Sequence, residues 1–63
     1  MNTIKKKCQD TGKSLGQVSR ETGISRHHLS NIVNDKAMPK IDTAYKIARA
    51  LKCNIEDLWS FEE

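Results

Sequence analysis

The feature that most constrains this chain is a Gly-Ile-Ser break at residues 23–25, which separates two short stretches with helical spacing. Ser14, followed three residues later by Gln17, has the spacing of a capping box, which satisfies N–H groups at the start of a helix. We therefore expect the first helix of the pair to begin at about Leu15. Gly23 supplies the left-handed backbone that closes many helices, so the chain is expected to turn there.

Small and apolar residues recur with the period of a helix on both sides of this break. The positions expected to face inward are Leu15, Val18, Ser19, Thr22, Leu29, Ile32 and Val33. Ser25 is a favourable N-cap for the second helix. The positions expected to face outward from that helix are Arg26, His27, Ser30 and Asn31. The outward row is therefore rich in hydrogen-bond donors.

Five helices fit the spacing of the whole chain, and no strand pattern competes with them. They are expected at residues 3–11, 15–22, 26–34, 41–51 and 55–59. The 63 residues suffice for one all-α domain, residues 1–63, with a core near the lower limit for independent folding. A separate ligand-sensing or catalytic domain has no room here, unless the chain is a fragment of a longer protein.

Four segments follow one another in an order typical of one family. They are the Gly-Ile-Ser break, Pro39, Tyr-Lys-Ile-Ala-Arg-Ala-Leu at residues 45–51 and Asn-Ile-Glu-Asp-Leu-Trp at residues 54–59. Together they resemble the Cro and repressor helix-turn-helix family of lambdoid phages, from about Ile4 to Trp59. The resemblance implies a compact five-helix lambda-repressor-like fold, with the helix-turn-helix formed by the second and third helices. It also implies a sequence-specific, double-stranded DNA-binding transcription regulator that acts as a repressor and a homodimer.

Several positions depart from the family pattern. Family members usually carry Gln at the position of Leu15 and an apolar residue at that of Lys13, so we interpret Leu15 as replacing the missing core contact. They often carry Ala at the position of Ser19. They also carry Gly at the positions of Asp35 and Lys52, where Asp and Lys tolerate a left-handed backbone less well than Gly.

Two further departures occur together. Several family members join an Arg of the first helix to a Glu that ends the third, and those positions are Cys8 and Val33 here. Replacing a whole buried ion pair with apolar residues is often neutral or stabilising, whereas losing one partner alone is costly. The double change therefore supports the alignment.

The resemblance assigns candidate DNA contacts residue by residue. Base contacts are expected from Ser25, Arg26, His27 and Asn31. Arg bonds guanine bidentately, Asn does the same with adenine, and His donates or accepts. Phosphate contacts are expected from the amides that start the second helix and from Ser14, Gln17, Ser30, Asn34, Lys36 and Lys40. The alternative, that these are ordinary solvated side chains, stays open, as does the orientation of His28.

Charge is unevenly distributed along the chain, whose net charge is +3. Residues 1–40 carry eight Lys or Arg against three acids, whereas residues 41–63 carry three against five. The basic part contains the candidate helix-turn-helix, and its positive charge suits a polyanion such as DNA. A solvated Lys-rich surface would have the same composition, so the motif decides between the two interpretations.

Other residue types indicate few further activities. Cys8 and Cys53 form no CxxC pair, and Cys8 is expected to pack as a small apolar residue. His27 and His28 are adjacent, so they point about 100° apart on a helix and do not form a ligand pair. We expect no metal, cofactor, small-molecule ligand or catalytic residue. No apolar run approaches the roughly 18 residues of a membrane span, so a cytoplasmic protein is expected.

The aromatic residues bear on assembly. Tyr45 is expected in or near the core. Ile55, Trp59 and Phe61 are expected to form a dimer interface, because the end of the chain is more apolar than a small monomer needs. Packing of Trp59 and Phe61 on the chain's own core is the alternative. For function, the alternative is a helix-turn-helix protein-interaction module or an antitoxin, which uses this fold without reading DNA.

Overall fold

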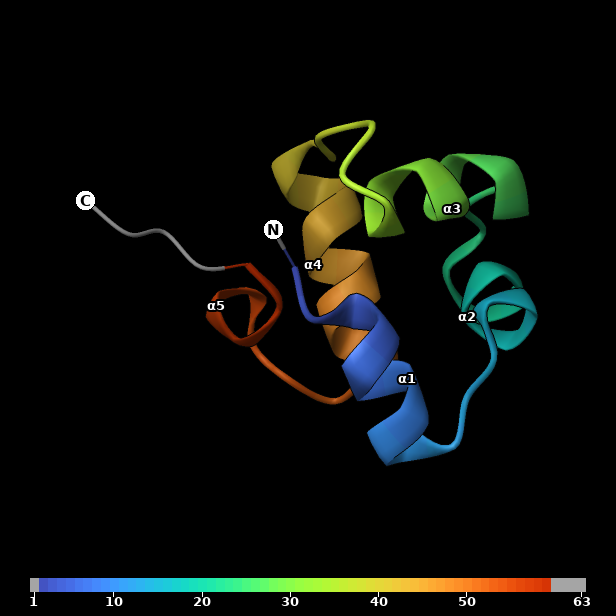
Figure 1. Cartoon of the computed structure of the whole chain (residues 1–63), viewed down its shortest axis with the longest axis vertical. Coiled ribbons are helices and arrows are strands. Elements are labelled where there is room, and N and C mark those ends of the chain that lie inside the picture. Colours follow the sequence, from blue (N-terminus) through green and yellow to red (C-terminus); the bar gives the residue numbers. More distant parts are fainter. Residues whose placement is uncertain (1, 60–63) are drawn as a thin grey trace.

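The computed structural model describes residues 2–59 and shows five helices in that range (Figure 1). They are α1 (Ile4–Thr11), α2 (Leu15–Thr22), α3 (Arg26–Val33), α4 (Ile41–Ala50) and α5 (Ile55–Leu58). Every bound lies within one residue of the expected one, so the all-α fold and the helix positions are confirmed. None of these helices is long and apolar enough to cross a membrane.

Left-handed backbone conformations end the helices where the sequence pattern places glycine or its replacements. Gly12 and Gly23 follow α1 and α2 with φ of 73° and 76°. Asp35 and Lys52 have φ of 59° and 56°. Both positions, where the resemblance predicts that glycine is common, are therefore left-handed. Glycine would adopt this conformation with less strain than Asp and Lys do.

A single apolar core joins the helices. Its fully buried large side chains are Ile4, Val18, Leu29, Ile32, Ile47, Leu51 and Leu58. Burying one such side chain contributes about 1.5–3 kcal/mol relative to leaving it exposed. Cys8 is buried in this core and Val33 packs against it, so the two positions at which the resemblance suggests an ion pair in several members are apolar here. Leu15 also packs against the core, which agrees with its interpretation as a replacement contact.

The helices are arranged around α4. Both α2 and α5 pack against α4, and α2 also packs against α3. Figure 1 shows α5 on the opposite side of α4 from α2 and α3. The helix-turn-helix and the end of the described chain therefore occupy different sides of the molecule.

The first described residues are tied to the last ones. Thr3 N donates to Leu58 O at 2.8 Å, and the Thr3 hydroxyl donates to Asp57 O at 2.6 Å. Asn2 and Trp59 form an isolated antiparallel bridge. These contacts hold the start of α1 beside α5.

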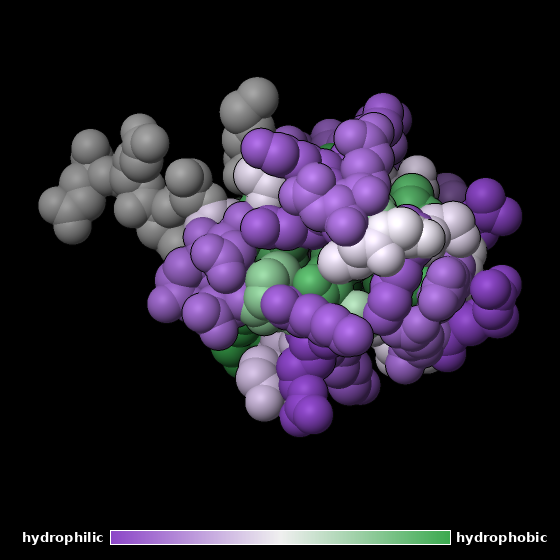
Figure 2. Space-filling model, turned by 90° about the horizontal axis from the view of Figure 1, so that it is seen from below, coloured by the Kyte–Doolittle hydropathy of each residue, from purple (hydrophilic) through white to green (hydrophobic). Residues whose placement is uncertain are grey.

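The surface at the lower end of Figure 1 is shown from below in Figure 2. It contains the end of α1 and the turns that follow α1 and α4. This face is mainly hydrophilic, and apolar atoms appear only in small areas at its centre and edge. The most exposed large apolar side chains of the described residues, Met38 and Ile41, lie at the opposite end of α4.

Candidate nucleic-acid interface

A side-chain cap starts α2, the first helix of the helix-turn-helix. Ser14 has an extended backbone, and its Oγ accepts a hydrogen bond from Gln17 N at 3.1 Å. The expected capping box is wrong in its other half, because the Gln17 amide donates to Glu21 Oε2 at 3.0 Å. Gln17 and Glu21 are neighbours on the helix surface, and a hydrogen bond to a carboxylate is stronger than one between neutral groups.

Side chains of α2 fix the turn that leads into α3. Gly23 supplies the left-handed backbone at the turn, with φ of 76°. Thr22 Oγ1 accepts from Ile24 N at 3.2 Å, and the Ser19 hydroxyl donates to Ile24 O at 2.5 Å. Ser19 makes this bond through its hydroxyl group, which an Ala at the same position would lack. These bonds anchor the backbone between the two helices.

The start of α3 presents the exposed side chains of the motif. Ser25 caps the helix, since its Oγ accepts from His28 N at 3.1 Å. Ser25, Arg26, His27 and His28 are exposed, whereas Asn31, one turn further on, is half-buried. Leu29 and Ile32 are buried on the other face, as expected. Three of the four expected base-contacting residues thus lie together at the exposed N-terminal end of α3.

The six side chains expected at phosphates differ in exposure. Ser14, Asn34, Lys36 and Lys40 are exposed, and Gln17 and Ser30 are half-buried. Asn34 Nδ2 lies 3.5 Å from Ser30 Oγ. Lys36 and Lys40 flank the loop from α3 to α4, and Lys40 is the N-cap residue of α4. DNA contact stays a prediction for these six residues and for the four residues that are expected to contact bases.

Lys13 joins α2 to α4, a role that the sequence reasoning missed. Its Nζ donates to Glu21 Oε1 at 2.8 Å and to Ala50 O at 2.6 Å. The carbonyl of Ala50 is one of the groups that a helix end leaves without an internal partner. The hydrogen bond from Lys13, followed by the one from Gln17, lowers the pKa of Glu21. The sequence signal for this role was Lys13 itself, a charged residue where the family resemblance predicts an apolar one.

Asn2 holds the C-terminal end of α3, and nothing in the sequence pattern indicated this contact. Its Nδ2 donates to Ile32 O at 3.0 Å, to Val33 O at 3.3 Å and to Asp35 Oδ1 at 3.0 Å. Its Oδ1 accepts from Ile4 N at 3.1 Å. One side chain therefore connects the last turn of α3 to the first turn of α1.

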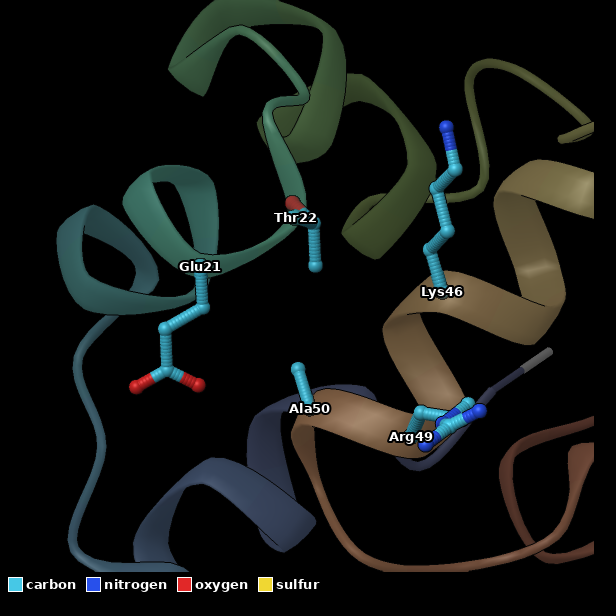
Figure 3. Close-up of a pocket in the computed structure, with 5 residues that line it drawn as sticks. All are labelled: Glu21, Thr22, Lys46, Arg49 and Ala50. Carbon is cyan, nitrogen blue, oxygen red and sulfur yellow. The ribbon is translucent and has the colours of Figure 1, made fainter.

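An open hollow of about 370 Å³ lies between α2 and α4 (Figure 3). Its lining residues are Glu21, Thr22, Lys46, Arg49 and Ala50. Figure 3 shows the Glu21 carboxylate and the cations of Lys46 and Arg49 pointing in different directions. A catalytic or cofactor site needs polar groups that converge on one point, and these do not.

Both cysteines are free thiols, with Cys8 buried and Cys53 half-buried. Burial raises the pKa of the Cys8 thiol. Burial and the charge of Asp57 raise the pKa of Cys53, against the opposite effect of Lys7. A raised pKa leaves less of the reactive thiolate at neutral pH. Among residues 2–59, no group of three or more His, Cys, Asp or Glu side chains is placed to hold a metal.

The expected position of Tyr45 is wrong. Its side chain is 53% exposed, and the guanidinium carbon of Arg49 lies 5.7 Å from the centroid of its ring. The buried positions of α4 are Ala44, Ile47 and Ala48, and they leave Tyr45 on the outward face. A tyrosine tolerates an exposed position because a phenolic hydroxyl forms hydrogen bonds with water.

The structure also corrects the expected exposure of Trp59. This side chain is only 6% exposed and belongs to the chain's own core, beside the bridge to Asn2. The alternative, packing of Trp59 within one monomer, is therefore correct for this residue. Ile55 is half-buried, and Phe61 lies outside the described residues. Sequence reasoning did not identify the exposed side chains of Met38 and Ile41 as candidates for a contact surface.

Comparison with known proteins agrees with this geometry. The model of the Cro/C1-type HTH DNA-binding domain matches residues 3–63. The chain therefore belongs to the Cro/C1-type helix-turn-helix DNA-binding domains, a class of DNA-binding transcription regulators. It is also 36% identical over 59 residues to the SPbeta prophage-derived uncharacterized HTH-type transcriptional regulator YopS of Bacillus subtilis (strain 168). The match covers 87% of this chain and 76% of that relative. The expected family is confirmed.

Proposed function

We propose that this chain binds a specific double-stranded DNA sequence as a homodimer and represses transcription there. The observation that carries the proposal is the start of α3. Arg26 and His27 are exposed there, on a backbone that the Ser25 cap holds in place. In helix-turn-helix proteins the second helix of the motif lies in the major groove, with its N-terminal residues at the base edges.

Base recognition is assigned to four residues by their chemistry. Arg26 binds guanine through O6 and N7, and Asn31 binds adenine through N6 and N7. His27 donates or accepts at a neighbouring base, and the Ser25 hydroxyl donates while its oxygen caps α3. Asn31 is half-buried, so its amide is less accessible than the side chains of Arg26 and His27.

Phosphate contacts orient the domain on the duplex. The free backbone amides at the start of α2, together with Ser14 and Gln17, bind DNA phosphates on one side of the major groove. The Gln17 amide has a second N–H beyond the one that Glu21 accepts. The remaining phosphate contacts that we propose come from Ser30, Asn34, Lys36 and Lys40 at the end of α3 and in the loop that follows it. These contacts carry affinity and register rather than sequence information.

Repression requires only that the bound dimer occupies a promoter. We propose residues 1–63 as one domain that supplies both the reader and the dimer contact, without catalysis. A two-fold dimer on an inverted repeat presents its two reader helices about 34 Å apart, one turn of DNA.

Selection of bound sites from a random duplex pool, at a stated salt concentration, tests the proposal. The expected result is an inverted repeat whose half-sites lie about one turn of DNA apart. Binding should weaken steeply with salt, because phosphate contacts release counterions. The double variant Arg26→Ala, His27→Ala is the control, since both side chains are exposed and the helical fold should persist.

Two outcomes would contradict the proposal. An enriched pool without a consensus sequence would leave only nonspecific binding. Absence of salt-dependent retention on any duplex would favour the protein-interaction module or antitoxin instead, because such a protein has no need of phosphate contacts.

A further inference from the structure

Helix α3 is held at both ends by hydrogen bonds from other parts of the chain. At its N-terminal end, side chains of α2 bond the backbone of Ile24 in the turn. At its C-terminal end, Asn2 Nδ2 donates to Ile32 O at 3.0 Å and to Val33 O at 3.3 Å. Apolar packing of the buried face has no preferred direction, whereas hydrogen bonds are directional. The two sets of bonds therefore fix the angle at which α3 lies on the core.

Asn2 is suited to anchor the C-terminal end because Asn2 is itself held in place. Its backbone forms the bridge with Trp59, and its Oδ1 accepts from Ile4 N at 3.1 Å. Its amide group has two N–H donors. They bond the end of α3 and also Asp35 Oδ1, at 3.0 Å. Both polar atoms of the Asn2 side chain therefore take part in attaching α3 to the start of α1.

The residue that ends this attachment has a strained backbone. Asp35 has φ of 59°, in the left-handed region where glycine is less strained. Glycine has no side chain that could accept a hydrogen bond, whereas the Asp35 carboxylate accepts from Asn2. Hydrogen bonds to a carboxylate are stronger than those between neutral groups. The bond to Asn2 therefore offsets part of the strain at Asp35, and strained residues persist where the surrounding structure holds them.

We propose that Asn2 is a positioning residue for base recognition and holds α3 at the angle that directs Asn31 to its base. The inference rests on the proposed function, in which Asn31 binds adenine. Asn31 directly precedes the two residues whose carbonyls Asn2 binds, and its own carbonyl accepts from Lys36 N at 2.8 Å. Arg26 lies at the other end of α3, next to the turn that α2 holds. The two candidate base contacts therefore depend on different anchors.

The separation of the two anchors makes this difference measurable. Arg26 and Asn31 are five positions apart. At a rise of about 1.5 Å per residue, they are separated by about 7.5 Å along the helix. When the C-terminal end of α3 is released, a tilt of about 10° about the turn moves Asn31 by about 1.3 Å relative to Arg26. A binding group has to be held to within roughly 0.5 Å of its productive position. Loss of the Asn2 anchor should therefore disturb the contact of Asn31 and spare that of Arg26.

The first test compares Asn2→Ala with Thr3→Val. Thr3→Val is the matched control, because it also removes a bond from the N-terminal segment to a distant carbonyl, but that carbonyl belongs to Asp57 and not to α3. Circular dichroism and urea unfolding establish conditions in which both variants are folded. The probes are the duplex selected from the random pool, its single-base variants and an unrelated duplex. A purely structural role of Asn2 would lower stability without changing any base preference.

Asn2→Ala should bind the selected duplex about tenfold more weakly than Thr3→Val does, which lies within the contribution of one bidentate base contact. It should lose its preference at the base pair where Asn31→Ala also loses it, and keep the preference that Arg26→Ala relaxes. In the double variant Asn2→Ala, Asn31→Ala the two losses should not add, because both act on one contact. The unrelated duplex should bind Asn2→Ala and Thr3→Val equally.

A second variant isolates the bonds that Asn2 donates. Asn2→Asp keeps the size of the side chain and the oxygen that accepts from Ile4 N, but a carboxylate has no N–H to donate at neutral pH. Gln9→Glu, at an exposed position of α1, changes the net charge by the same amount. Asn2→Asp should lose the preference at the Asn31 base pair, and Gln9→Glu should keep it.

Three outcomes would overturn the inference. Unchanged base preferences in both Asn2 variants would show that Asn2 only stabilises the fold, although sequence-specific DNA binding would stand. Equal losses at the base pairs of Arg26 and Asn31 would show that the two ends of α3 do not depend on separate anchors. A wild type without base preference on any duplex would reject the proposed function itself, and the inference with it.

Discussion

The α2–α3 side and the α4–α5 side of this molecule differ in one respect, since, among residues 2–59, only the second exposes large apolar side chains beside its charged ones. At the start of α3, Arg26 and His27 are exposed above a buried apolar face. At the start of α4, the exposed large apolar side chains are Met38 and Ile41, which line one hollow with the buried Trp59. The first side suits a polyanion that supplies acceptors, and the second suits an apolar partner. The two kinds of surface thus lie on two sides of α4.

The polar groups between these two sides are satisfied within the chain. Asn2 binds the last turn of α3 and shares a bridge with Trp59, and Lys13 binds both Glu21 and Ala50. Such bonds fix the helices to one another because an unpaired polar group inside the fold is costly. Specific hydrogen bonds therefore join the α2–α3 side of the molecule to the α4–α5 side.

The largest expected effect follows from the buried side of this comparison. Trp59→Ala should lower the free energy of unfolding by about 3–5 kcal/mol, because it removes a core aromatic and leaves a cavity. Urea unfolding followed by circular dichroism measures this difference. A domain of this size has little stability in reserve, so the variant should be largely unfolded.

Ile41→Ala is the control for that measurement. Its side chain is 75% exposed, so the free energy of unfolding should change by less than about 0.5 kcal/mol. Equal and small losses in the two variants would show that Trp59 is not part of the core. Equal and large losses would show that Ile41 is covered within the monomer.

The second effect tests the polar side. Arg26→Ala should weaken specific binding by roughly 1–3 kcal/mol and relax the preference at one base pair, if Arg26 binds guanine. Arg20→Ala is the matched control, because Arg20 is an exposed arginine of α2 outside the assigned contacts. Titration of both variants against single-base variants of the selected site distinguishes them. A uniform loss over all sequences would make Arg26 a phosphate contact.

The sequence allowed the helices to be placed because their signals are local. Ser14 and Ser25 are caps that act within three residues, and Gly23 determines the turn by its own backbone. The apolar period identified Leu29 and Ile32 as buried, and it left Arg26 outside. Family resemblance then gave these helices their order and their expected roles.

The features that the sequence did not reveal depend on contacts between distant residues. Asn2 binds carbonyls 30 and 31 positions away, and Lys13 binds a carbonyl 37 positions away. No period or cap marks a bond of that kind. The aromatic assignments failed for a related reason. Residue type alone made Tyr45 a candidate for the core. Its burial depends instead on which face of α4 meets the core, and Tyr45 lies on the other face.

A third effect concerns the loop that lies between the two sides. Lys36→Ala should weaken specific and nonspecific binding together and reduce the slope of log affinity against log salt by about one, because one phosphate contact is lost. Lys6→Ala, an exposed lysine of α1 outside the assigned contacts, serves as the control. Titrations over a range of salt concentrations give the slope. An unchanged slope in Lys36→Ala would remove this residue from the DNA interface.

The smallest expected effect tests the framework between the sides through its pH dependence. Hydrogen bonds from Lys13, and then from Gln17, lower the pKa of Glu21. A carboxylate with a lower pKa in the folded than in the unfolded chain stabilises the fold above the unfolded pKa, and this contribution disappears as the pH falls through the folded pKa. The free energy of unfolding should therefore decrease as the pH falls below the usual range of Glu, near about 4.3. Glu21→Gln should show a smaller decrease because it cannot ionise.

Urea unfolding at neutral and acidic pH measures this difference, and Glu56→Gln, at an exposed carboxylate of α5, is the control. The change should be modest, since the Glu21 side chain is exposed and solvent screens its pair with Lys13. At neutral pH the Glu21→Gln variant should be slightly less stable than the wild type, and at acidic pH the two should converge. Parallel pH curves for wild type and Glu21→Gln would mean that the Lys13 to Glu21 bond does not stabilise the fold in solution. The attachment of α2 to α4 would then depend on the Lys13 to Ala50 bond and on apolar packing alone.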